Sequence, residues 1–261
     1  MSIGISTSCF YPLVTEQALA ELLKNNVKTT EIFFNSRCEL EPAFIGGLVE
    51  LLSQTGGKVT AIHPFTSGYE PYLLFSRYER RFSDGLELYR RYFEAAAALN
   101  AKYVILHGDK ALSEIEDSMF FERVNTLCEA SKPFGVQVLQ ENVNKFRGET
   151  PAFLRSYRHA LGDNAEFVFD VKQAVRAGYD PFEILDAMGK KIRHVHLSDH
   201  SGKNDCLLPG QGEFDFRRLF GRLKAFDYSG DLVLEVYREA FSKTEEILQS
   251  ADMLRHLTDL S

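Results

Sequence analysis

The chain of 261 residues has no long hydrophobic run. Its longest apolar stretches, such as Tyr103–Leu106 and Leu232–Leu234, have the length of strands, whereas a membrane-spanning helix needs roughly 18 to 20 residues. A membrane span is therefore excluded. Proline and glycine are modest in number, at 8 and 18, and no segment is of low complexity, which argues against long disorder and fibrous architectures.

Cysteine and positive charge are also limited. The four cysteines, Cys9, Cys38, Cys128 and Cys206, contain no C-x-x-C pair, which argues against a disulfide framework and a thiolate zinc site. The N-terminal segment MSIGISTSCFYP has neither a basic leader nor an apolar core, so we expect a cytoplasmic protein. Lys and Arg number 30 against 37 Asp and Glu, and with a net charge of −7 we expect no nucleic-acid partner.

Short β-branched runs alternate with amphipathic stretches along the whole chain, which is typical of repeated βα units. Eight strands are predicted, at Ile3–Thr7, Thr29–Phe34, Val59–His63, Tyr103–His107, Val136–Gln140, Glu166–Asp170, Ile192–Leu197 and Leu232–Glu235. Eight units of about 33 residues favour a (β/α)8 TIM barrel, formed as a single α/β domain by residues 1–261. No G-x-G-x-x-G follows the first strand and no P-loop motif occurs, which weakens nucleotide-binding alternatives.

Helix-start signals lie between the predicted strands. They are Thr150 before Pro151, Asp180 before Pro181, and Ser242 followed three residues later by Glu245 as a capping box. Each signal predicts that a helix begins where a βα unit requires one.

Polar residues end six consecutive predicted strands. They are His63, His107, Glu141, Asp170, His196 and Glu235. A single such residue would be an ordinary structural histidine or solvated carboxylate. In a (β/α)8 barrel, however, the carboxyl ends of the strands form the active-site face, so the six side chains should converge there.

Converging carboxylates repel one another and are costly to desolvate unless a cation neutralises them. No Lys or Arg ends these strands, so we expect a divalent metal ion: Mn²⁺, Mg²⁺, Co²⁺ or Zn²⁺ could occupy a mixed site of carboxylates and imidazole. A metal that holds a carbonyl and a neighbouring hydroxyl acidifies the C–H between them and stabilises an enediolate. Glu141 and Glu235 would then remove and return the proton as catalytic residues.

The segment 198–214 comes after the seventh strand. The motif LPGQGEFDF begins in this segment and ends two residues after it. Gly210 and Gly212 permit tight turns, and Asp215 is placed to cap the next helix. The segment is either a turn with a helix cap or, because it lies beside His196, a loop that contacts or gates the substrate.

Nearly the whole chain resembles the xylose isomerase-like TIM barrel superfamily, which includes sugar and sugar-phosphate isomerases and epimerases, inosose dehydratase and endonuclease IV. The motifs that carry the resemblance are QENV, FVFDVKQA, HVHLSDH, LPGQGEFDF and LVLEVY. The resemblance implies that Glu141, Asp170, His196 and Glu235 are the metal ligands. It also implies that the two glutamates are the acid/base pair of a ketose epimerase.

The chain departs from this family after the sixth strand. The family commonly has D-x-G-H-A, whereas Asp170 is followed here by Val171, Lys172, Gln173 and Ala174. Gln173 can bind a hydroxyl but is a poor metal ligand. Lys172 is either a solvated lysine or a positive charge that favours an anionic or phosphorylated substrate.

His63 and His107 match the first-zinc histidines of endonuclease IV, which leaves a two-metal site bridged by Glu141 open, although sugar isomerases often use such residues to contact substrate. We therefore expect His63, His107, Lys172 and Gln173 to bind substrate. The loop after the seventh strand lacks the Asp-x-His pair that endonuclease IV uses for a third zinc.

The leading prediction is a metal-dependent isomerase or epimerase of a small sugar, keto-sugar or sugar phosphate. The alternatives are a lyase that dehydrates a polyol, an endonuclease IV-like hydrolase and a sugar-binding barrel without catalysis. The resemblance also suggests a homo-oligomer, a dimer or a tetramer.

Overall fold

The computed structural model describes residues 1–259 and places eight parallel strands in one closed barrel. Adjacent strands in the barrel follow the chain order and β8 pairs with β1, which confirms the predicted (β/α)8 fold. The strands are β1 Ile3–Ser6, β2 Thr29–Phe33, β3 Lys58–His63, β4 Tyr103–Leu106, β5 Gln137–Glu141, β6 Phe167–Asp170, β7 Ile192–Leu197 and β8 Leu232–Leu234. The bounds differ from the predicted ones by at most one residue at either end.

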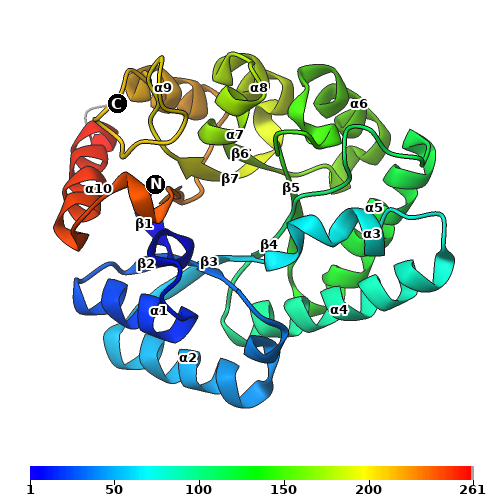
Figure 1. The fold of residues 1–261 in the computed structure, drawn as a ribbon, viewed down its shortest axis with the longest axis horizontal. Coiled ribbons are helices and arrows are strands. Elements are labelled where there is room, and N and C mark those ends of the chain that lie inside the picture. The colour runs from blue at the N-terminus through cyan, green and yellow to red at the C-terminus, as the bar shows by residue number, and fades with distance from the viewer. Residues whose placement is uncertain (260–261) are drawn as a thin grey trace.

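Helices surround the barrel on all sides (Figure 1). They are α1 Thr15–Lys24, α2 Pro42–Thr55, α3 Glu70–Leu73, α4 Glu79–Ala98, α5 Asp117–Ser131, α6 Pro151–Leu161, α7 Val171–Arg176, α8 Pro181–Met188, α9 Phe216–Ala225 and α10 Thr244–Asp259. None of the helices in this part of the chain is long and apolar enough to cross a membrane.

Two of the three predicted helix starts are confirmed. The Thr150 hydroxyl accepts the N–H of Phe153 and the Asp180 carboxylate accepts the N–H of Phe182, which satisfies backbone donors at the first turns of α6 and α8. The third prediction is wrong in register. Glu246, and not Glu245, accepts the N–H of Ser242, because α10 begins two residues after that serine.

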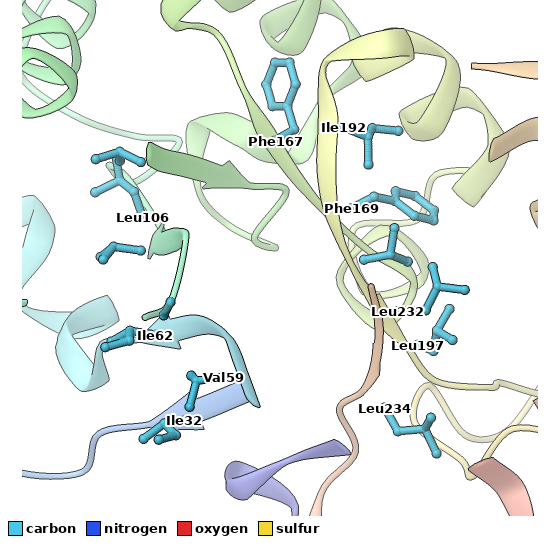
Figure 2. Close-up of a cluster of buried hydrophobic side chains, with 14 of the residues drawn as sticks. Ile32, Val59, Ile62, Leu106, Phe167, Phe169, Ile192, Leu197, Leu232 and Leu234 are labelled. Carbon is cyan, nitrogen blue, oxygen red and sulfur yellow. The ribbon is translucent and has the colours of Figure 1, made fainter. Parts of the chain in front are cut away.

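Two hydrophobic layers hold the barrel together. The larger one lies between the strands and the helices, and Figure 2 shows strand side chains that belong to it, among them Ile62, Leu106 and Phe169. The second is a small cluster of Ala61, Ile105, Leu139 and Val168, with Tyr103 packed against it.

The alternation of side chains along each strand explains where the polar residues lie. Successive side chains of a strand point to opposite faces, so residues two apart share a face. Each of the four residues in the small cluster comes two positions before His63, His107, Glu141 or Asp170. The apolar cluster therefore closes the barrel interior, and the next residue on the same face of each strand is a polar group at the carboxyl end.

Candidate metal centre

The structure brings the predicted site residues together at the carboxyl ends of the strands. A cavity of about 400 Å³ opens there. It is lined by Ser8, Tyr11, Phe33, Asn35, His63, Ser67, His107, Glu141, Val143, Phe146, Lys172, Gln173, Glu235, Val236 and Tyr237. Asp170 and His196, each 1% exposed, are not among the lining residues but lie next to Glu141 and Glu235, which are.

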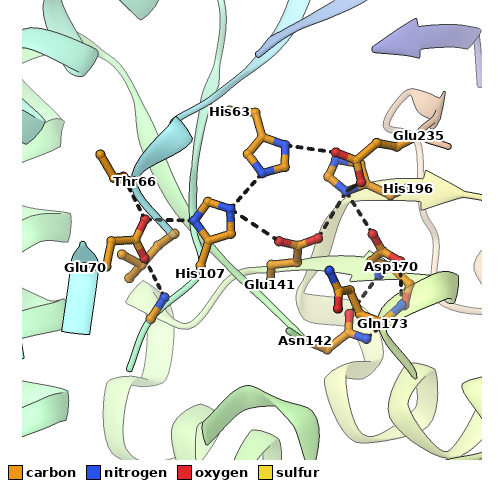
Figure 3. A network of polar contacts seen from close by, with 12 residues as sticks. His63, Thr66, Glu70, His107, Glu141, Asn142, Asp170, Gln173, His196 and Glu235 are labelled. Atoms are coloured by element: carbon orange, nitrogen blue, oxygen red, sulfur yellow. Dashed lines mark hydrogen bonds and ion pairs between the residues drawn. The ribbon is translucent and has the colours of Figure 1, made fainter. Parts of the chain in front are cut away.

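One nitrogen of His196 faces three carboxylates. Nδ1 lies 3.3 Å from Glu141 Oε1, 3.5 Å from Asp170 Oδ2 and 3.3 Å from Glu235 Oε2 (Figure 3). One ligand atom from each of these four residues lies within 4.8 Å of the others, and all four residues are buried. A single N–H cannot satisfy three carboxylates, so these carboxylates need a further positively charged partner.

Asp170 presents to this cluster one oxygen that has no hydrogen bond. Its Oδ1 accepts the N–H of Gln173 at 2.8 Å and caps α7, while Oδ2 is buried without a hydrogen bond. The Asn142 side chain fixes the backbone of Asp170 by donating to its carbonyl and accepting its N–H. A buried carboxylate oxygen without a donor is costly, and a metal ion at this point would satisfy it.

The charges of the cluster depend on one another. Burial alone would raise the pKa of Glu141, but the hydrogen bond and charge of His196 outweigh it and hold that pKa at about 2. Burial likewise opposes ionisation of Glu235, whose pKa is nevertheless held well below its usual range by Lys172 and His196. For Asp170 burial dominates over the charge of Lys172 and raises the pKa.

His63 and His107 meet beside Glu141. Their Nε2 atoms are 2.9 Å apart, and His107 Nε2 lies 4.0 Å from Glu141 Oε2. Burial would lower the pKa of His63, but hydrogen bonds to Glu235 and Glu31 raise it to about 10, so His63 can donate from both nitrogens. With Glu141 these histidines form a second group of possible metal ligands, adjacent to the first.

Two buried carboxylates orient the histidines, and neither is predicted from the sequence. Glu31, in β2, accepts from Ser6 Oγ and His63 Nδ1 at 3.2 Å through Oε1, and Oε2 lies 2.8 Å from His194 Nε2 and 2.9 Å from His196 Nε2. Burial opposes its ionisation, but the charge of His196 and these hydrogen bonds hold its pKa well below the usual range. Its signal in the sequence is one acidic residue among the β-branched and aromatic residues of a predicted strand.

Glu70 in α3 does the same for His107. Its carboxylate contacts His107 Nδ1 at 2.8 Å and accepts from Tyr89, Thr66 and the backbone N–H of Gly108 (Figure 3). No sequence motif marks Glu70, because α3 has only four residues and is too short to show helical periodicity in the sequence.

Lys172 is neither solvated nor free. Its side chain is 5% exposed, and Nζ lies 3.0 Å from Glu235 Oε2 and 3.7 Å from Asp170 Oδ2. Burial would lower its pKa, but Glu235 and Asp170 raise it well above its usual value. The interpretation of Lys172 as a solvated lysine is therefore wrong, because α7 begins directly at the end of β6 and brings the Lys172 side chain back to the carboxylates.

The segment 198–214 is ordered by one carboxylate. Asp199 accepts the backbone N–H groups of His200, Gly210, Gly212 and Phe214 at 2.8 to 2.9 Å. Gly210 has φ of +93°, and Asp215 caps α9 by accepting the N–H of Arg218, as predicted. None of the described residues of this segment lines the cavity, which favours a turn with a helix cap over substrate contact.

The sequence matches the model of a known protein family. Residues 20–257 match the model of the xylose isomerase-like TIM barrel family, and the chain belongs to that family. An uncharacterized protein of Methanocaldococcus jannaschii is 28% identical over 266 residues, which cover 95% of this chain and 88% of that protein. The fructoselysine 3-epimerase of Escherichia coli O157:H7 is 22% identical over 182 residues, 66% of each chain.

Solved structures share the same fold. A D-tagatose 3-epimerase-like protein aligns with a TM-score of 0.82 at 22% identity, covering 100% of this chain and 98% of that one. The IOLI protein, in a structure with a bound zinc atom, aligns with a TM-score of 0.79 at 19% identity, covering 100% and 99%. At these identities the likeness shows the fold.

Proposed function

We propose that this chain is a metal-dependent epimerase or isomerase of a small keto-sugar. The observation that carries the proposal is the meeting of Glu141, Asp170, Glu235 and His196 in one buried cluster, two of whose members line a cavity of about 400 Å³. The epimerase activity of the fructoselysine relative and the zinc atom in the IOLI structure support it.

The residues present fit a divalent metal. Glu141, Asp170, His196 and Glu235 would hold it with three carboxylate oxygens and one imidazole nitrogen, a donor set that suits Mn²⁺, Mg²⁺, Co²⁺ or Zn²⁺. Such an ion is a Lewis acid that stabilises negative charge on substrate oxygens. Whether His63, His107 and Glu141 hold a second ion or bind substrate is decided by metal stoichiometry.

Glu141 and Glu235 are the proposed acid/base pair. They extend from β5 and from the end of β8, so they reach the cavity from separate strands. Both are ionised, and either can accept the proton from the carbon next to the carbonyl. Water returns a proton to that carbon, either directly or through the other carboxylate once that group has taken a proton from water, and return to the opposite face gives the epimer.

The cavity lining supports an uncharged substrate. Lys172 is the one lysine or arginine among the described residues that line it, and its ammonium group already bonds Glu235. Tyr11, Phe33, Phe146 and Tyr237 present apolar rings, as in many small-molecule sites. His63, His107 and Gln173 would bind hydroxyl groups, although Gln173 Oε1 also accepts the N–H of Asn144.

Substitution of the two glutamates tests the proposal. Glu141→Gln and Glu235→Gln keep the side-chain size and remove the base, so turnover of responsive ketopentoses or ketohexoses should fall by roughly 10²- to 10⁴-fold. Elemental analysis should show metal lost from both variants. Glu166→Gln is the matched control, because Glu166 pairs with Arg193 at the amino-terminal end of the barrel and should leave metal and turnover unchanged. Unchanged turnover in both site variants would refute the proposed roles.

A further inference from the structure

Lys172 is the one site residue whose position neither the family pattern nor the proposed chemistry explains. It lies in the first turn of α7, the helix that Asp170 caps, and its side chain passes into the group of metal-ligand residues. Its ammonium group lies 3.0 Å from Glu235 Oε2, an oxygen that also lies 3.3 Å from His196 Nδ1. The ammonium group therefore contacts the Glu235 oxygen that faces the His196 nitrogen of the proposed metal site.

We propose that Lys172 is a resident counter-ion of the metal site, which binds Asp170 and Glu235 when no divalent ion is present and competes with that ion for them. This inference rests on the proposed function, because it takes the four-residue cluster to be the metal site. Two positive charges near the same carboxylates repel each other, so binding of the ion must weaken or displace the lysine contact.

The surroundings of Lys172 give its ammonium group a second contact. The ring of Tyr237 lies 5.0 Å from Nζ, within the range of a cation–π interaction, and Arg176 lies over the same ring at 4.9 Å. Arg176 is itself held by Asp205 at 2.5 Å. The ammonium group can thus keep the contact with Tyr237 when it releases Glu235, which makes its displacement feasible without a change in fold.

The effect of Lys172 on metal affinity can be sized from the hydrogen bond to Glu235 that the ammonium group must lose when the metal binds. A charge-assisted hydrogen bond corresponds to roughly a 10- to 100-fold change in an equilibrium constant. Lys172→Met removes the ammonium group and keeps a long apolar side chain. We expect this variant to bind Mn²⁺ roughly 10- to 100-fold more tightly than the wild type.

The experiment measures the Mn²⁺ dissociation constant by competition with a chelator at constant pH. Lys172→Arg keeps the charge and should remain close to the wild type. Lys110→Met is the matched control, because it makes the same change at an exposed lysine whose ammonium group lies over the Phe146 ring, 5.8 Å from its centre. It should leave the Mn²⁺ affinity unchanged, which separates a local contact from an effect of net charge.

Thermal stability gives a second readout. Without metal, Lys172→Met leaves the carboxylates without their cation, so the Tm should fall, and saturating Mn²⁺ should restore it to that of the Mn²⁺-loaded wild type. A variant that folds only with Mn²⁺ also supports the proposal. Equal or weaker Mn²⁺ binding by a folded Lys172→Met overturns this inference alone. Failure of both wild type and variant to bind Mn²⁺, Co²⁺ or Zn²⁺ overturns this inference and the proposed metal site together.

Discussion

Replacement of Glu31 by glutamine should lower stability and metal affinity, although Glu31 is not one of the four proposed metal ligands. Glu31 is fully buried, and its two oxygens contact Ser6, His63, His194 and His196. Glutamine keeps the shape but turns one oxygen into an NH₂ group, which cannot accept. At least one pair of these contacts is then lost.

The expected loss of stability follows from those contacts. Removing one partner of a buried charged network costs about 3 to 5 kcal/mol, because the groups left behind are unpaired. For a domain of this size, that corresponds to a fall in Tm of roughly 6 to 20 °C. Because Glu31 orients His196 through Nε2, metal affinity should also fall by roughly 10- to 100-fold.

Glu70→Gln is the matched control for Glu31→Gln. Glu70 is also buried and also accepts several hydrogen bonds, but it contacts His107 and not His196. We expect a lower Tm in both variants, measured by circular dichroism, and weaker metal binding only in Glu31→Gln. A Glu31→Gln protein with the Tm and metal affinity of the wild type would refute the orienting role of Glu31.

Two further predictions concern the backbone around the site. Asp199→Ala removes the acceptor of four backbone N–H groups of the segment 198–214. Trypsin should therefore cleave this segment at Lys203 at least about tenfold faster than in the wild type. An unchanged cleavage rate would contradict the ordering role of Asp199. Gly108→Ala should lower the free energy of unfolding, measured by urea titration, by about 1 to 3 kcal/mol. The reason is that φ of Gly108 is +90° and that a Cβ atom at this position would lie 2.9 Å from the Gln140 amide. A variant with wild-type stability would show that this turn tolerates a side chain.

The sequence was sufficient to predict the barrel and the convergence of the polar residues that end its strands. Strand periodicity and βα spacing located all eight strands, and the polar residues that end β3 to β8 converge because the parallel strands all point the same way. Asp170 and His196 could be predicted to meet since their strands are neighbours, and the register pairs these two residues directly.

The remaining parts of the site depend on side-chain direction and irregular backbone. Glu31 lies inside a strand, so its role follows only from the face to which it points. Glu70 contacts His107 from α3, a helix too short to show periodicity in the sequence. The contact of Lys172 with Glu235 depends on the direction in which α7 leaves β6. A residue pattern does not encode these directions, so the lysine appeared solvated although it is buried.

The most direct test of the proposed function is exchange of a substrate proton with solvent. Wild-type protein loaded with Mn²⁺ is incubated in D₂O with ketopentoses and ketohexoses, and the sugars are followed by NMR. We predict deuterium at the carbon next to the carbonyl and the appearance of the epimer, with no loss of water. Loss of water from the substrate would identify a dehydratase instead, and absence of deuterium with Mn²⁺, Co²⁺, Mg²⁺ and Zn²⁺ alike would contradict proton transfer by Glu141 and Glu235.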